Sequence, residues 1–257
     1  MSNGIMIVKR DGAKENLNID KIHFVVEEAC KNLAGTSSSQ IEMNANLQFY
    51  DGMTTEEIQE ILIRSANDLI SLEAPNYQTA AARLLSYSVN KQVFGEFKAI
   101  PLKEMIDINI ERGVYDPEFL NYYTDEEIAK LDSFICHTRD EVFTYAGMRQ
   151  VVDKYLCQDR SNNQLFETPQ IMYMMIAATL FSQYPKETRL QYVRRYYNAT
   201  SLFKINIPTP VMAGVRTPVR QFASCVLVDS ADTLDSIFAS DMAIGRYTAQ
   251  RAGIGIN

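Results

Sequence analysis

The chain has 257 residues, of which 46% are hydrophobic and 22% are charged, and its formal net charge is −7. This length and apolar content suffice for a large buried core in more than one domain. The negative charge argues against a broad phosphate-binding surface, so we expect no nucleic-acid partner. No apolar run reaches the roughly 18 residues of a membrane span, and the N-terminus lacks the pattern of a signal peptide. We therefore expect a cytoplasmic protein with no membrane partner.

Metal-binding residues are scarce in this sequence. The four cysteines, at positions 30, 136, 157 and 225, show no CxxC spacing, and there are only two histidines. The sequence offers few ligand residues for a zinc site, so we expect no metal in this chain. In a reducing cytosol, a disulfide would be catalytic and transient. Cys30 falls on the apolar face of a predicted helix, where we expect it to be buried and inert; Cys136 and Cys157 are expected to be structural.

The first predicted element is a hairpin between residues 5 and 18. Two short strands flank Asp11-Gly12, a dipeptide that favours the positive φ angles of a type I′ turn. Polar side chains crowd the hairpin and the stretch after it, namely those of Lys9, Arg10, Glu15, Asn18 and Lys21. They fit either a solvated edge hairpin, whose charges discourage strand pairing, or a nucleotide pocket in which Lys9 and Lys91 contact phosphates.

Three helices are predicted after this hairpin. Asp20 is placed to N-cap the first, and Gly35 to end it. A capping box of Thr54 and Glu57 begins the second, and the third begins near Pro75 and runs to Lys91. The sequence therefore predicts a hairpin laid over a small helical bundle.

The run VKRDG, followed by a glutamate, an asparagine and DKI, resembles the ATP-cone, an allosteric nucleotide-binding module of many ribonucleotide reductase large subunits. The resemblance implies an activity site that binds ATP as activator and dATP as inhibitor, although some cones bind without regulating. It assigns to this site the residues Lys9, Arg10, Glu15, Asn16, Leu17, Asn18, Ile19, Asp20, Lys21, Thr55 and Lys91.

The middle of the chain is predicted to be mostly helical. The polar loop 158–164 joins two short apolar runs that indicate a second hairpin. Thr168-Pro169 then opens a helix with a methionine stripe, which we expect to fill the core. Residues 185–199 mix basic and aromatic side chains; an amphipathic helix with its basic residues in water is favoured over a surface that stacks nucleic-acid bases. Prolines make residues 205–219 a shaped loop rather than a regular helix.

The last segment has the pattern of a strand, a helix and a second strand. Phe222 to Val228 is predicted as a buried strand, Asp232 can N-cap the helix, and Gly253 begins the next strand. Such a βαβ unit has parallel strands and requires a larger sheet or barrel.

Four motifs in this order, IPTP, RQFASC, DTLDSI and QRAGIGIN, resemble the opening of the catalytic barrel in the large subunit of class I, aerobic ribonucleotide reductases, which act on ribonucleoside diphosphates. The whole chain resembles these subunits in order and spacing. The implied fold class is α+β and mostly helical. It would comprise an ATP-cone over residues 1–92, a helical domain over 93–219, and the first βαβ unit of an incomplete ten-stranded α/β barrel over 220–257.

The resemblance also implies the chemistry. Cys225 matches one thiol of a redox-active pair, although a cysteine in a strand can also be a small buried hydrophobe. Substrate contacts are implied for Thr209, Ser224 and Gly253. A specificity site for a deoxynucleotide or ATP is implied for Asp232, Thr233 and Leu234, although on sequence alone Asp232 is only an N-cap.

The partners implied are a radical-generating small (beta) subunit, a second large subunit in a homodimer, and thioredoxin or glutaredoxin as reductant. A C-terminal large-subunit fragment would complete the barrel, and the chain alone would be inactive. A naturally split gene is slightly favoured over a truncation. The alternative function is a non-catalytic ATP-cone protein that senses nucleotides, although the CxxC zinc ribbon of such repressors is missing. The motif spacing suits the aerobic enzyme better than an anaerobic glycyl-radical reductase.

Overall fold

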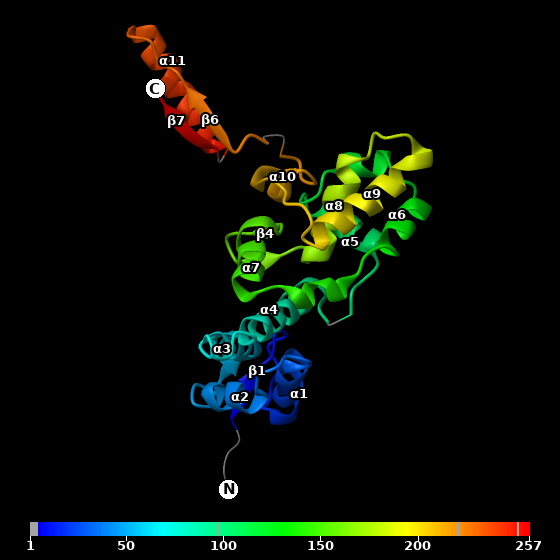
Figure 1. Ribbon diagram of the computed structural model, residues 1–257, viewed down its shortest axis with the longest axis vertical. Coiled ribbons are helices and arrows are strands. Elements are labelled where there is room, and N and C mark those ends of the chain that lie inside the picture. Colours follow the sequence, from blue (N-terminus) through cyan, green and yellow to red (C-terminus); the bar gives the residue numbers. More distant parts are fainter. Residues whose placement is uncertain (1–4, 97, 220–221, 251) are drawn as a thin grey trace. The chain divides into compact units, whose positions relative to one another are not determined.

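The computed structural model describes residues 5–96, 98–219, 222–250 and 252–257 (Figure 1). The chain divides into two units: the first comprises Met1–Ile100 and Cys136–Gln170, and the second comprises Pro101–Ile135 and Ile171–Asn257. Helices dominate and the sheets are small, which confirms the α+β, mostly helical fold class. The ten-stranded barrel and the domain boundaries after residues 92 and 219 stay predictions.

The first unit begins with a three-stranded sheet in the order β2-β1-β3. Its strands are β1 (Met6–Val8), β2 (Lys14–Asn16) and β3 (Met53–Thr54). The predicted hairpin of β1 and β2 is confirmed, whereas β3, which runs parallel to β1, was not predicted.

The predicted type I′ turn of this hairpin is wrong. Of its two central residues only Gly12 has a positive φ, at 81°. The Gly12 N–H donates to the Lys9 carbonyl at 2.9 Å, and the Lys9 N–H donates to the Ala13 carbonyl at 2.8 Å. This is the pattern of a turn closed by a glycine bulge, which needs one left-handed residue and spares Asp11 that conformation.

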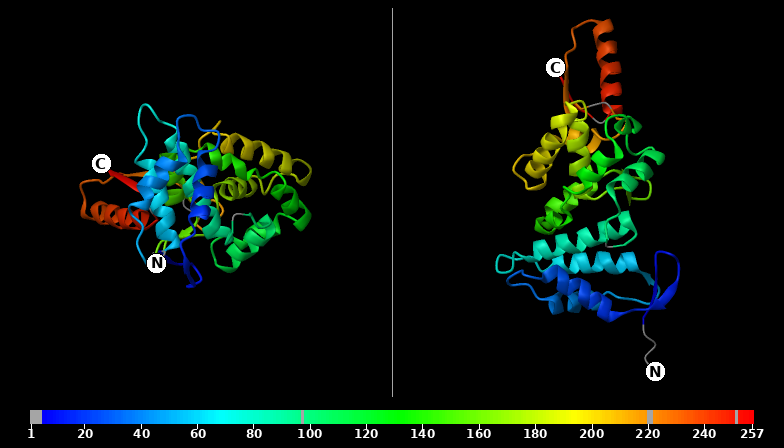
Figure 2. Two further views of the ribbon diagram at one scale, coloured as in Figure 1. Left: turned by 90° about the horizontal axis from the view of Figure 1, so that it is seen from below. Right: turned by 90° about the vertical axis from the view of Figure 1, so that its right-hand side faces the viewer.

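Four helices complete the N-terminal part of this unit: α1 (Ile19–Cys30), α2 (Ser38–Asn46), α3 (Thr55–Asn67) and α4 (Tyr77–Phe94). Helix α4 packs against α1 and α3, and α2 packs against both of these helices (Figure 2). The capping box of Thr54 and Glu57 is confirmed, with both of its reciprocal hydrogen bonds. Helix α2 was not predicted.

The predicted ends of α1 are wrong. Asn18, not Asp20, is the N-cap: it has an extended backbone, and its side chain accepts the Lys21 N–H at 3.1 Å. Asp20 lies in the first turn, where its negative charge still interacts favourably with the helix dipole. The helix ends at Cys30, before Gly35, and Cys30 is half-buried rather than buried.

The remainder of the first unit consists of short elements. They are the 3₁₀ turn η2 (His137–Val142), α7 (Tyr145–Gln150), the π-helical turn η3 (Val151–Tyr155), β4 (Gln158–Asp159) and β5 (Gln164–Leu165). Strands β4 and β5 confirm the second hairpin. Asp140 of η2 is buried and accepts from Nε2 of Gln170 at 2.7 Å, and burial raises the pKa of its carboxyl to about 7.

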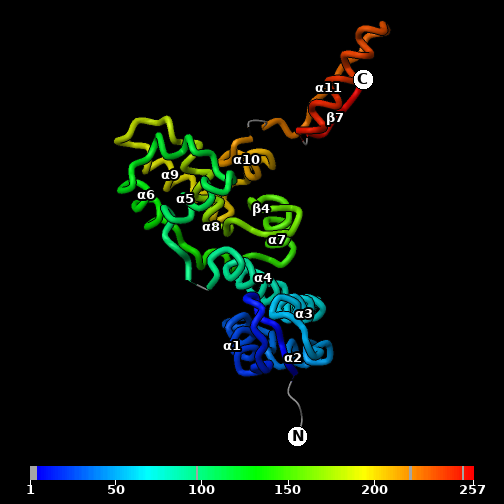
Figure 3. The backbone as a smooth tube through the Cα atoms, turned by 180° about the vertical axis from the view of Figure 1, so that it is seen from behind, coloured from blue at the N-terminus to red at the C-terminus, as the bar shows by residue number. Residues whose placement is uncertain are grey.

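The second unit contains α5 (Leu102–Glu111), the 3₁₀ turn η1 (Pro117–Asn121), α6 (Asp125–Asp132), α9 (Lys186–Ser201) and α10 (Thr209–Gly214), together with most of α8 (Pro169–Leu180). Helices α6 and α9 contact each other (Figure 3). The methionine stripe on α8 is confirmed as core, since Met172 is 0% and Met175 1% exposed.

Two predictions for residues 185–219 of this unit are wrong. Arg189 of α9 is 2% exposed and pairs with Glu127 of α6, although its helix was expected to keep its basic residues in water. Residues 209–214 form a short helix rather than a loop, because Pro210 lies in the first turn, where the missing N–H costs nothing.

The predicted βαβ unit is confirmed by β6 (Cys225–Val228), α11 (Leu234–Ala249) and β7 (Gly253–Ile256), with Cys225 opposite Gly253 in a parallel pair. Strand β6 is not buried as predicted: Leu227 is 89% exposed, because the described residues of this sheet form only two strands. Thr233, not Asp232, is the N-cap of α11, since its side chain accepts the Ser236 N–H at 3.2 Å.

Candidate functional site

A cavity of about 370 Å³ opens between the β1–β2 hairpin and helices α1, α3 and α4. Its polar lining comes from Lys9, Arg10, Glu15, Asn18, Lys21, Thr55, Gln59, Ser88 and Lys91. Its apolar lining comes from Ile7, Leu17, Ile22, Val25, Ile58, Leu62 and Tyr87. The cavity therefore combines a charged side with an apolar side, as a nucleotide requires for its phosphates and its base.

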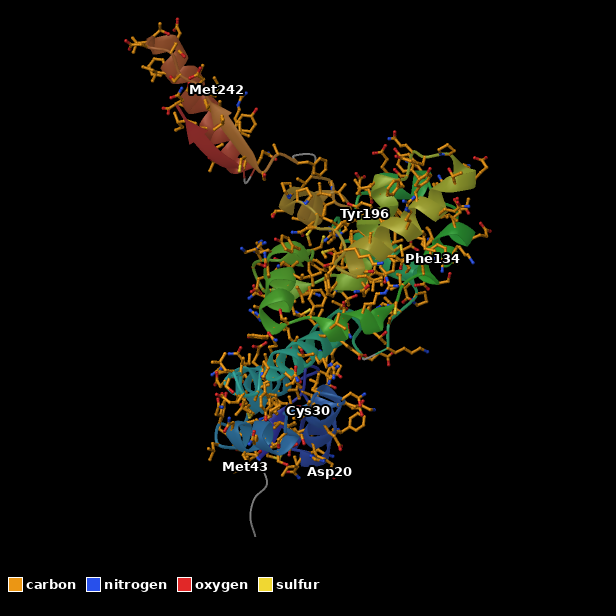
Figure 4. The ribbon with its side chains drawn as sticks, in the orientation of Figure 1. Asp20, Cys30, Met43, Phe134, Tyr196 and Met242 are labelled. Carbon is orange, nitrogen blue, oxygen red and sulfur yellow. The ribbon has the colours of Figure 1, made fainter. Side chains whose placement is uncertain are left out.

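Local structure explains which predicted residues reach this cavity. Along β2, successive side chains point to opposite faces, so Glu15 lines the cavity and Asn16 does not. On α1, residues three or four apart share a face, so Asn18, Lys21, Ile22 and Val25 line the cavity. Ile19 and Asp20 point elsewhere; Ile19 is 62% exposed, and Asp20 lies on the outside of this unit (Figure 4).

Positive charge exceeds negative charge in the cavity. Lys9, Arg10, Lys21 and Lys91 line it, and Glu15 is the one lining carboxylate among the residues that the structure describes. Lys21 Nζ lies 3.6 Å from Glu15 Oε1, while Arg10 is held from outside the cavity by Glu56, at 2.8 Å between Nε and Oε1. The cluster is thus suited to an anion carrying several charges.

The electrostatics of Lys91 point the same way. Partial burial, and then the nearby charges of Arg10, Lys21 and Lys9, lower the pKa of its ammonium, and only Glu15 acts against them. A polyphosphate beside Lys91 would stabilise the charged ammonium and so raise this pKa again. The cationic side chains that line the cavity repel one another, and a bound anion would reduce this repulsion.

The sequence reasoning missed most of the apolar side of the cavity and two polar residues, Gln59 and Ser88. Ile22, Ile58 and Leu62 lie at helical spacing, so the sequence marks them only as core. Gln59 and Ser88 carry no sequence signal of their own. The Gln59 Nε2 donates to the Leu84 carbonyl at 2.8 Å, which ties α3 to α4 beside the cavity.

The second group of predicted site residues includes Cys225, whose side chain is exposed and forms no disulfide. A Cβ built on Gly253 would lie 3.7 Å from Cys225 Sγ and 3.4 Å from the Ser224 carbonyl oxygen. Glycine at this position therefore leaves the flank of the thiol open. Ser224 and Gly253 adjoin Cys225, whereas Thr209 begins α10, and no contact between Thr209 and Cys225 is described.

The three residues of the predicted specificity site lie together at the start of α11. Thr233 caps the helix, and Leu234 is 70% exposed. Because β6 runs from Cys225 to Val228 and α11 follows it, these residues and the thiol lie at opposite ends of the strand.

Two absences hold for the part of the chain that the structure describes. No described helix has both the length and the apolar character needed to cross a lipid bilayer. Nor do the described histidine, cysteine and acidic side chains form a group of three that could hold a metal ion.

Two stretches of the chain match known protein families. Residues 5–92, which contain the whole cavity, match the ATP cone domain. Residues 141–220 match the all-alpha domain of ribonucleotide reductase. The two matches thus define a protein with an ATP cone followed by the all-alpha domain of a ribonucleotide reductase.

Similarity to whole proteins makes the family specific. The chain is 49% identical to Ribonucleoside-diphosphate reductase 1 subunit alpha of Escherichia coli strain K12, over all of this chain and 34% of that protein. It is 48% identical to the Ribonucleoside-diphosphate reductase subunit alpha of Haemophilus influenzae, over all of this chain and 34% of that protein. It is 42% identical to the Ribonucleoside-diphosphate reductase subunit alpha of Enterobacteria phage T4, over 98% of this chain and 33% of that protein. Over its whole length the chain is therefore similar to ribonucleoside-diphosphate reductase alpha subunits. It spans about a third of the length of these relatives.

Proposed function

We propose that this chain is the effector-binding N-terminal part of a ribonucleoside-diphosphate reductase. Together with the remaining length found in its relatives, it would convert ribonucleoside diphosphates to 2′-deoxyribonucleotides for DNA synthesis. The observation that carries the proposal is the cavity of the ATP cone, where four cations face an apolar wall. A non-catalytic sensor would need the same cavity, but the match of residues 141–220 to the reductase helical domain favours the enzyme.

The ligand proposed for the cavity is ATP as activator or dATP as inhibitor. Lys9, Arg10, Lys21 and Lys91 would contact the phosphates, because ammonium and guanidinium groups form charge-assisted hydrogen bonds with them. The apolar wall would hold the base. Asn18, Thr55 and Glu15 would supply polar contacts to the base or ribose. Leu17 lines the cavity as well, whereas contacts from Asn16, Ile19 and Asp20 stay predictions.

The chemistry proposed for Cys225 is electron donation to the ribose. Two thiols close into one disulfide and release two electrons and two protons; the ribose 2′-hydroxyl leaves as water, and hydrogen takes its place. The step also needs a substrate radical, which a beta subunit would generate. The second thiol would come from the remaining length found in the relatives. Thioredoxin or glutaredoxin would then reduce the disulfide.

The remaining assignments follow from the same proposal. Thr209, Ser224 and Gly253 would contact the substrate. Asp232, Thr233 and Leu234 would bind a deoxynucleotide or ATP at the interface of an alpha-subunit dimer, where it selects the base that is reduced. A cytoplasmic location and a further polypeptide that completes the barrel stay predictions.

Replacing Lys91 with alanine tests the nucleotide site. We expect ATP affinity, measured by isothermal titration calorimetry on the full chain, to fall about tenfold or more, because one charge-assisted contact is lost. The matched control is Lys14→Ala, which removes a lysine of the same hairpin whose side chain does not line the cavity. Equal affinity in the two variants would count against the site.

A further inference from the structure

We propose that Arg83 is a positioning residue that couples nucleotide binding in the cavity to the η2 turn, residues 137–142. The inference rests on the proposed function, because it requires the cavity to bind ATP. The inference adds a path by which ATP binding affects a distant turn, through contacts of Arg83 that do not involve the ligand.

Arg83 joins three segments of the first unit. Its Nη1 donates to the Lys31 carbonyl at 2.7 Å and to the Ala29 carbonyl at 3.2 Å. Its Nε donates to the Glu141 carbonyl, also at 3.2 Å. One planar guanidinium on α4 thus holds the end of α1 and the η2 turn together, which a planar fork of donors does well.

The contact with α1 is favourable for two reasons. The last carbonyls of a helix have no partner within it, and two such groups at the end of α1 accept from Arg83. A positive charge also complements the dipole at a helix C-terminus. The end of α1 is therefore fixed to α4 rather than free to fray.

The other end of α1 lines the cavity. Asn18, Lys21 and Ile22 belong to its N-cap and first turns, so this 12-residue helix meets the ligand at its start and Arg83 at its end. Helix α4 offers a second link, because Tyr87, one turn after Arg83, lines the cavity. A ligand that shifts α1 or α4 would therefore move the Arg83 contacts.

The receiving turn is tied to the helix that follows in the chain. Next to Glu141, the buried Asp140 accepts from Gln170 in the first turn of α8. The ring of His137 contacts that of Phe94 of α4 edge to face, with the centroids 6.1 Å apart. A displacement of the Glu141 carbonyl would therefore act on the start of α8, whose chain continues into the second unit.

Hydrogen–deuterium exchange of the full chain with and without ATP tests the route. In the native chain we expect ATP to slow amide exchange in residues 18–25, at the cavity. We also expect ATP to slow exchange about fivefold in residues 137–142. In Arg83→Met the effect of ATP on 137–142 should disappear, while the protection of 18–25 remains. The matched control, Arg64→Met, removes an exposed arginine of α3 and should behave like the native chain.

The outcomes separate the inference from the proposed function. A purely structural role for Arg83 would change exchange in 137–142 equally with and without ATP, and an undiminished ATP effect in Arg83→Met would overturn the inference. If the native chain binds ATP but ATP does not change exchange in residues 137–142, the inference is also overturned. This outcome does not depend on whether Arg83→Met folds. The second variant is Arg83→Lys, which keeps the charge but loses the planar fork, and it should also lose the ATP effect on residues 137–142. A chain that does not bind ATP at all would remove the proposed function itself.

Discussion

Replacing Cys225 with serine is expected to lower CDP reduction about a thousandfold or more when the chain is assembled with the rest of the alpha subunit, a beta subunit and a reductant. A serine hydroxyl can hydrogen-bond to substrate, but it cannot form a disulfide, so the two electrons have no source. The exposed position of Cys225, beside a glycine that leaves its flank open, suits a group that must meet both a substrate and a second thiol.

The control for this experiment is Cys136→Ser. Cys136 is half-buried in the first unit, and its Sγ lies 3.3 Å from the Thr138 hydroxyl, an interaction that a serine can reproduce. We expect this variant to keep its activity. Full activity in Cys225→Ser, measured as dCDP formed, would remove the role proposed for this thiol.

Replacing Arg189 with methionine is expected to lower the free energy of unfolding by about 3 kcal/mol, because a buried ion pair loses one partner. The Arg189 Nε donates to Glu127 Oε1 at 3.0 Å, and its Nη2 donates to the second carboxylate oxygen. The guanidinium also stacks 4.4 Å from the centre of the Tyr123 ring. Burial acts to raise the pKa of Glu127, but its bonds to Arg189 and to the Thr124 N–H hold it below its usual value.

Chemical denaturation of the full chain measures this effect. Arg195→Met is the matched control, since Arg195 is exposed on the same helix, and we expect it to change the free energy by less than about 0.5 kcal/mol. Adding Glu127→Gln to Arg189→Met should recover part of the loss, because the unpaired charge is then removed. If Arg189→Met matched its control, the buried pair would not hold α9 to α6.

Local sequence signals predicted the elements whose causes are themselves local. The capping box needs only Thr54 and Glu57, and the hairpin needs only a glycine between two short strands, so both were predicted correctly. The turn type and the N-caps failed because neighbouring residues compete for the same role. Asn18 displaced Asp20, and Thr233 displaced Asp232.

Long-range features could not be predicted in this way. An arginine on α9 looks solvated until Glu127, 62 positions earlier, is known to lie beside it. The apolar wall of the cavity has the same spacing as core, so no pattern separates a residue such as Ile58 from its buried neighbours. The crowded polar residues of the hairpin left two interpretations open, and the resemblance of the VKRDG run to the ATP-cone favoured the nucleotide pocket. The structure brings Lys91, near the end of α4, to the same cavity.

The most direct test of the nucleotide site is a crystal structure of the chain grown with ATP. We predict that the triphosphate lies against Lys9, Arg10, Lys21 and Lys91 and that the base lies against the apolar wall of the same cavity. An empty cavity at saturating ATP, or a nucleotide bound elsewhere on the chain, would contradict the account.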